Sequence, residues 1–219
     1  ESPAAWAVAQ ELLADPVPHV QFMGAQTFYL KVKRQWDTLP EQAALIAALF
    51  AYLRDGAALQ AQTCLRLALC ISALVVRTLL GVWPSALEDV IQFGRESSAP
   101  ESRYLAAQML TSVPEELQDL PPMLRVRSSP TAQALVAKVN ILVVFILECI
   151  ETSDLRPGGL CEIALQCIVQ WTKALKVRFC ENAALSQCLV QLLRAEALAE
   201  SLLEVFIECL QNGEMASSV

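Results

Sequence analysis

A helix–turn–helix pattern that returns about every 40 residues is the feature of this sequence that most constrains its fold. In its clearest copy, apolar side chains fall three or four residues apart, as a buried helical face requires. These positions are Phe22, Ala25, Tyr29, Val32 and Trp36. Pro40 then ends the segment and opens a second amphipathic helix. A period of this length predicts an all-α fold, an α–α superhelix (solenoid) of HEAT or armadillo repeats.

The same reading divides the whole chain into about five helix pairs without strand candidates. Helices are expected at residues 3–14, 19–36, 40–54, 58–80, 84–94, 101–111, 131–150, 160–175, 180–193 and 197–210. A turn is expected at 113–117, next to Pro114, and an irregular stretch at 120–130. Residues 1–219 are therefore expected to form one solenoid segment. Neither end carries the polar outer face of a capping repeat, so we expect further repeats at both ends to stabilise it.

Two runs are apolar enough to raise the question of a membrane. Residues 67–76 contain one polar side chain, Ser72, and residues 141–147 contain none. Both are shorter than the ~20 residues that a helix needs to cross a bilayer. They predict buried helices, which suits a chain with 55% hydrophobic residues.

Charge and cysteine usage exclude several classes of function. The formal net charge is −7 and no basic stripe is present, so the sequence does not predict direct nucleic-acid binding. An acidic chain is better suited to a basic partner protein, or its charge simply keeps it soluble. The chain has eight cysteines, no C-x-x-C pair and a single histidine, His19. This pattern predicts structural thiols in a reducing compartment, with no metal site and no cofactor. Phosphate-loop and nucleophile motifs are lacking, so no enzyme is predicted.

Four stretches, in order and at matching spacing, resemble one known family. The first is Trp6 with residues 12–18, and the second and most specific is VQFMGAQT at 20–27, continuing to WDTLP at 36–40. The third is TCLRLAL at 63–69, followed by Trp83-Pro84 and the helix 85–93, and the fourth is LTSVPEEL at 110–117. Together they resemble the amino-terminal part of the importin-β (karyopherin-β) nuclear transport receptors, on the importin-13 and transportin-SR branch. The resemblance covers residues 6–117.

This resemblance implies a partner and a location. In the family, the amino-terminal HEAT repeats bind the small GTPase Ran in its GTP form, mainly through the second (B) helix of each repeat on the concave surface. Cargo proteins lie along the rest of the arch, nuclear pore proteins are further possible partners, and the receptors shuttle between cytoplasm and nucleus. No membrane insertion is implied.

The candidate Ran contacts lie on two predicted B helices. Glu41 and Tyr52 are on the helix after Pro40, while Ser85, Asp89 and Gln92 are four and three residues apart and share one polar face. A polar face that is simply solvated is the alternative for any one of these residues. For the chain as a whole, the alternative is a HEAT-repeat scaffold that does not bind Ran.

Three tryptophans are also open to two interpretations. Trp is enriched at protein interfaces, so Trp36, Trp83 and Trp171 could contact a partner. Trp36 and Trp83 each stand at a helix end beside a turn, and aromatic side chains are mostly buried, which favours packing between helices.

Overall fold

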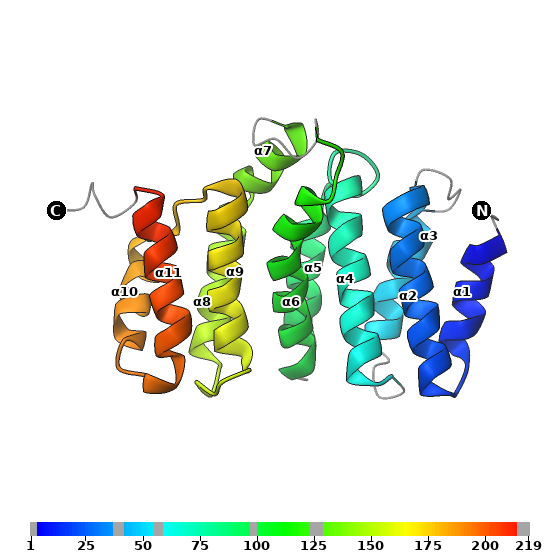
Figure 1. The fold of residues 1–219 in the computed structure, drawn as a ribbon, viewed down its shortest axis with the longest axis horizontal. Helices are drawn as coiled ribbons and strands as arrows, with labels where there is room; N and C mark the ends of the chain where they lie inside the picture. The colour runs from blue at the N-terminus through cyan, green and yellow to red at the C-terminus, as the bar shows by residue number, and fades with distance from the viewer. Residues whose placement is uncertain (1–3, 37–41, 55–58, 97–99, 123–128, 214–219) are drawn as a thin grey trace.

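The computed structural model describes residues 4–36, 42–54, 59–96, 100–122 and 129–213. Within these ranges the regular structure is helical and contains no strand. The helices pack into an elongated array in which each new unit is added to one end of the previous one (Figure 1). The predicted all-α solenoid is therefore confirmed.

The array has two layers. The first layer is a row in which each helix packs on the next: α1 (Ala4–Ala14), α2 (Pro18–Gln35), α4 (Ala61–Thr78), α6 (Pro100–Gln118), α9 (Leu160–Leu175) and α11 (Ala199–Gln211). The second layer lies behind it in Figure 1: α3 (Gln42–Arg54), α5 (Ala86–Glu96), α8 (Val139–Glu151) and α10 (Ala183–Leu192). The short helix α7 (Pro130–Ala137) lies at the upper edge of the array in Figure 1, near its middle, and two 3₁₀ turns, η3 (Phe179–Glu181) and η4 (Glu196–Leu198), flank α10 in sequence.

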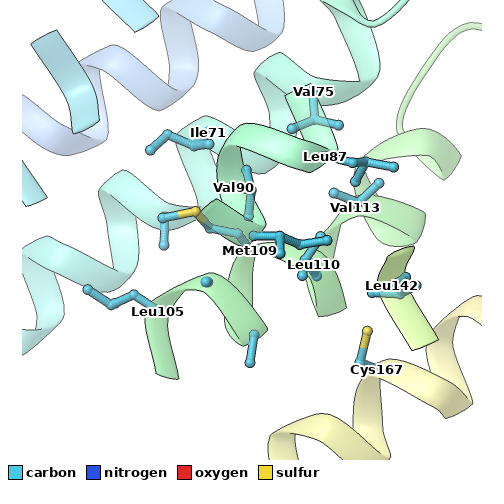
Figure 2. Close-up of a cluster of buried hydrophobic side chains, with 14 of the residues drawn as sticks. Ile71, Val75, Leu87, Val90, Leu105, Met109, Leu110, Val113, Leu142 and Cys167 are labelled. Atoms are coloured by element: carbon cyan, nitrogen blue, oxygen red, sulfur yellow. The ribbon is translucent and has the colours of Figure 1, made fainter. Parts of the chain in front are cut away.

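Apolar side chains from both layers meet around α6. Figure 2 shows Met109, Leu110 and Val113 of α6 between α4 and α5 on one side and α8 and α9 on the other. All three side chains are fully buried. Because every inner helix is covered by its own partner and by the units on both sides, the apolar stripe must be wide, which accounts for the hydrophobic composition.

The two apolar runs belong to buried helices, as predicted. By length and composition alone α4 could cross a membrane, and so could α7 and α8 together if they formed one span, although they meet at an angle of 51°. However, 67% of the α4 window is buried inside the protein, where α4 packs between α2 and α6. Six residues of α8 are buried as well. A core helix of a solenoid needs this apolar surface for packing alone.

One predicted break is wrong, because α6 runs without interruption through Pro114. A proline inside a helix has no N–H to donate to the carbonyl four residues earlier, here that of Leu110. In the structure Trp171 of α9 satisfies this carbonyl, with its Nε1 2.8 Å from Leu110 O. The tertiary contact thus replaces the missing backbone hydrogen bond, and the expected turn at 113–117 does not form.

The sequence analysis also predicts one helix where the structure has two. The predicted helix 131–150 is two helices, α7 and α8, joined at Lys138 with a bend of 51°. No Gly or Pro marks the bend in the sequence. The side chain of Lys138 forms an ion pair with Glu88 of α5. Because α8 packs on α5 and α9, the chain must turn here to enter the second layer.

The tryptophans and cysteines occupy the core positions that the sequence favoured. Trp36 and Trp83 are each 6% exposed, which confirms the predicted packing between helices. Trp171, for which both interpretations were open, is fully buried as well. Six of the eight cysteines are buried, and the other two, Cys180 and Cys188, are half-buried.

Gly24 lets α1 and α2 approach closely enough for their backbones to touch. A Cβ at this position would lie 2.7 Å from Leu13 N and 2.9 Å from Ala9 O, both of which are backbone atoms that cannot rotate away. We therefore expect Gly24→Ala to push α1 away from α2 and to lower the free energy of unfolding by about 1–3 kcal/mol, despite the better helix propensity of Ala. Hydrogen exchange checks this: amides of α1 should lose protection, while those of α9 should not change. Unchanged protection in α1 would contradict the steric argument.

Candidate partner-binding groove between α3 and α5

A groove of about 360 Å³ separates α3 from α5 in the second layer. Its lining residues come from α3, from the turn before α5 and from α5 itself: Ala43, Ile46, Ala47, Phe50, Arg54, Val82, Trp83, Asp89, Gln92 and Glu96. On α3, Ala43, Ala47, Phe50 and Arg54 follow one another at three- and four-residue spacing, with Ile46 beside Ala47, and so form a single stripe. Two alanines in this stripe leave the space that the groove occupies.

The floor of the groove is aromatic and rigid. Phe50 is 5% exposed and packs edge-on against Trp83, with ring centroids 5.7 Å apart and planes at 83°. Its centroid is 5.5 Å from that of Phe93. Such tilted pairs are a favoured geometry for aromatic rings. The three rings thus tie α3 to α5 beneath the groove.

An ion pair closes one end of the groove. Arg54 Nη2 lies 3.0 Å from Glu96 Oε2, and the guanidinium carbon of Arg54 is 5.8 Å from the Phe50 ring centroid and 5.9 Å from that of Phe93. Both charged side chains are about half exposed. A pair this exposed contributes little to stability, so both groups can exchange their mutual contact for contacts with a partner.

Asp89 stabilises the α5 side of the groove, which faces the α3 stripe. Its Oδ2 accepts hydrogen bonds from Trp83 Nε1 at 2.6 Å and from Ser85 Oγ at 2.9 Å. The Asp89 amide also donates to Ser85 O at 2.9 Å, at the start of α5. The carboxylate therefore orients the indole of Trp83 and stabilises the first turn of the helix, where the helix dipole favours a negative charge.

The structure brings some of the sequence-predicted site residues together and separates others. Asp89 and Gln92 line the groove, and Ser85 joins it through Asp89. Tyr52 does not belong to the lining and packs half-buried against the core, and Glu41 lies outside the described residues.

Sequence reasoning missed the α3 side of the groove. On this helix the sequence analysis names Glu41 and Tyr52 as candidate contacts, whereas the stripe that lines the groove contains Ala43 and Ala47. The available signal was the spacing of these two alanines from Phe50 and Arg54.

The described residues hold no group of three or more His, Cys, Asp or Glu side chains that could bind a metal ion. The groove offers an aromatic floor, two carboxylates and one guanidinium. Its chemistry suits recognition of another protein's side chains.

Comparison with known proteins identifies the family of this chain. The family described as exportin 1-like protein matches residues 60–211, more than half of the chain. This chain belongs to the exportin 1-like family. The match includes α5, which forms one side of the groove. It also extends well beyond residue 117, where the resemblance found in the sequence ends, and includes α8, α9 and α10.

Individual proteins that resemble this exportin 1-like chain support a role in the same class of proteins as the importins. Importin-13 of Bos taurus is 27% identical over 222 aligned residues, and importin-13 of Homo sapiens and of Mus musculus are each 28% identical. In all three cases the alignment covers 97% of this chain and 22% of the relative. The chain therefore spans about a fifth of the length of these relatives. The resemblance to the importin-β family on the importin-13 branch is confirmed.

Proposed function

We propose that this chain is a segment of a nuclear transport receptor and that it contributes the binding site for the small GTPase Ran in its GTP form. Family membership and the importin-13 relatives support the receptor class. The groove between α3 and α5 supports the site, because it lies in the layer of second helices through which such receptors are expected to bind Ran. It also contains Asp89 and Gln92, two of the residues expected from the sequence.

The proposal extends to the other partners. Cargo proteins would bind along the rest of a longer arch, nuclear pore proteins would interact with the receptor during passage, and the protein would shuttle between cytoplasm and nucleus. We propose a binding role without catalysis, since the described lining of the groove presents no nucleophile with an adjacent base.

Discrimination between GTP and GDP would be indirect. The γ-phosphate orders the switch segments of small GTPases, and those segments become disordered after hydrolysis. A surface that packs on ordered switch segments therefore senses the nucleotide without touching it. A groove with a rigid floor binds side chains of such a segment more tightly when the segment is already held in one conformation, because less conformational entropy is then lost on binding.

The decisive experiment measures binding of Ran loaded with GTP or with GDP to the parent chain and to Ala47→Arg. Ala47 is exposed and lines the groove, so the longer side chain should fill the groove without disturbing the core. We expect the parent to prefer Ran–GTP, and we expect Ala47→Arg to weaken that binding about tenfold or more. Circular dichroism should be unchanged.

Ala51→Arg is the matched control, because Ala51 is an exposed alanine of the same helix that does not line the groove. If both variants lowered affinity equally, the groove would not be the site. A parent that bound both nucleotide forms equally, or neither, would replace the proposal with the alternative, a HEAT-repeat scaffold without Ran binding.

The charge of Asp89 can be tested separately. Replacement by Lys would also remove the acceptor for Trp83 Nε1 and so disturb the wall of the groove. Asp89→Asn keeps an oxygen that can accept this hydrogen bond. If the partner surface is basic, this variant should bind with a slower association rate and a weaker dependence on salt.

A further inference from the structure

A contact between two cysteines from different elements lies at the carboxyl-terminal end of the array. The Cys180 thiol, in η3, donates a hydrogen bond to Cys209 Sγ of α11, and the sulfur atoms are 3.1 Å apart. The residues are 29 positions apart in sequence, so the packing of α11 on α9 creates the contact. A disulfide bond is about 1 Å shorter, which a small rotation of the side chains can supply.

The backbone around Cys180 is firmly held. The chain leaves α9 through Lys176 in a left-handed conformation, with φ at 56°. It enters α10 through Asn182, whose side chain accepts a hydrogen bond from Leu185 N at 3.0 Å. Ser186 Oγ donates to Cys180 O at 2.7 Å. These bonds fix Cys180 relative to α10, and Cys209 is fully buried in α11, so the pair is preorganised.

We propose that Cys180 and Cys209 form a reversible disulfide when glutathione disulfide accumulates, which makes the pair a redox-sensitive link between the α9–α10 unit and α11. The half-buried Cys180 reacts first: its thiolate attacks one sulfur of glutathione disulfide, forms a mixed disulfide and releases one glutathione. The sulfur of Cys209 then attacks the Cys180 sulfur and releases the second glutathione. Two protein thiols are oxidised, one glutathione disulfide is reduced, and the two thiol protons end on the released glutathiones.

Three cysteines in the core of the array are poor sites for this chemistry. Burial raises the pKa of Cys149 to about 12 and also raises the pKa of Cys70 and Cys167 above the ordinary thiol value. A higher pKa lowers the fraction of reactive thiolate near neutral pH. Cys188 of α10 is half-buried like Cys180, so it is a suitable control for simple accessibility.

The test treats the protein with glutathione disulfide and follows it by intact mass spectrometry and non-reducing peptide mapping. We expect the parent to lose two hydrogen atoms and to yield one peptide pair that joins Cys180 to Cys209. Cys188→Ser should behave in the same way, and Cys180→Ser should form no internal disulfide. Amides within residues 180–209 should exchange at least about tenfold more slowly in the oxidised protein, because the crosslink restricts local opening, and a thiol reductant should reverse this.

Two outcomes would overturn the inference. One is a parent protein that gains glutathione adducts only, or does not react, under conditions that oxidise accessible thiols. The other is an internal disulfide that persists in Cys180→Ser. Neither outcome depends on whether the chain binds Ran, so the redox link and the proposed function can fail separately.

Discussion

Replacing Trp171 with Phe is expected to lower the free energy of unfolding by about 2–3 kcal/mol. Trp171 is fully buried, so the smaller ring leaves a cavity in the contact between α6 and α9. The variant also removes the side chain that donates to Leu110 O, which has no backbone partner four residues on because Pro114 lacks an N–H. A buried carbonyl left without a donor costs about 1–3 kcal/mol. Urea unfolding followed by circular dichroism measures the change.

A double-mutant cycle with Pro114→Ala separates the hydrogen bond from the lost volume. The alanine in this variant has an N–H that can donate to Leu110 O, so this carbonyl no longer depends on Trp171. In the Pro114→Ala background, Trp171→Phe should therefore cost about 1 kcal/mol less than in the parent. An equal cost in both backgrounds would mean that the bond between Trp171 and Leu110 does not compensate for the proline.

Replacing Lys33 with Met is the second large effect, with an expected loss of about 2 kcal/mol. Glu116 of α6 is almost completely buried, and Lys33 of α2 lies 3.6 Å from its Oε2. Tyr29 donates to Glu116 Oε1 at 2.6 Å, and Lys33 also forms an ion pair with Asp119. Without Lys33, the buried carboxylate of Glu116 would lose its ion pair with α2 and keep only the longer-range attraction of Arg77 on α4, which makes its burial unfavourable.

The pKa values of Lys33 and Tyr29 reflect both their burial and their contacts with Glu116 and with each other. Burial opposes the charged form of Lys33, but hydrogen bonds to Asp119 and Tyr29 and the charge of Glu116 outweigh it and raise the pKa of Lys33. For Tyr29, burial first and then the hydrogen bond to Glu116 raise the pKa. Lys33 therefore stays protonated in the folded protein.

The double variant Lys33→Met with Glu116→Gln should recover most of the lost stability. The glutamine carries no charge, and its oxygen can still accept the hydrogen bond from Tyr29. Arg156→Met is the surface control: the Arg156 side chain is 77% exposed and pairs with Asp154, which is 55% exposed, so its loss should cost less than about 1 kcal/mol. Equal losses for Lys33→Met and Arg156→Met in urea unfolding would contradict the role assigned to burial.

The candidate groove shows which features of a binding site helical periodicity can predict and which it cannot. The spacing of Asp89 and Gln92 correctly places both on one side of α5, because a helix repeats every 3.6 residues. The sequence could not show that Asp89 accepts a hydrogen bond from Trp83, nor that the groove uses Ala43 and Ala47 of α3. These facts depend on the rotation of α3 relative to α5, which the aromatic contacts of Phe50 decide.

The sequence by itself determined the class of fold, the presence of most helices and the burial of Trp36, Trp83 and the apolar runs. Each of these follows from local quantities, namely the period of apolar residues, the helix-ending prolines and glycines, and the length of each run. Tertiary structure alone decided that α6 continues through Pro114, that the chain bends at Lys138 and that Cys180 meets Cys209. In each case the deciding contact joins residues far apart in the chain: Trp171 supplies a hydrogen bond that the backbone lacks, α8 must reach α5, and α11 packs on α9. Such contacts have energies comparable to local propensities, so local pattern alone cannot predict them.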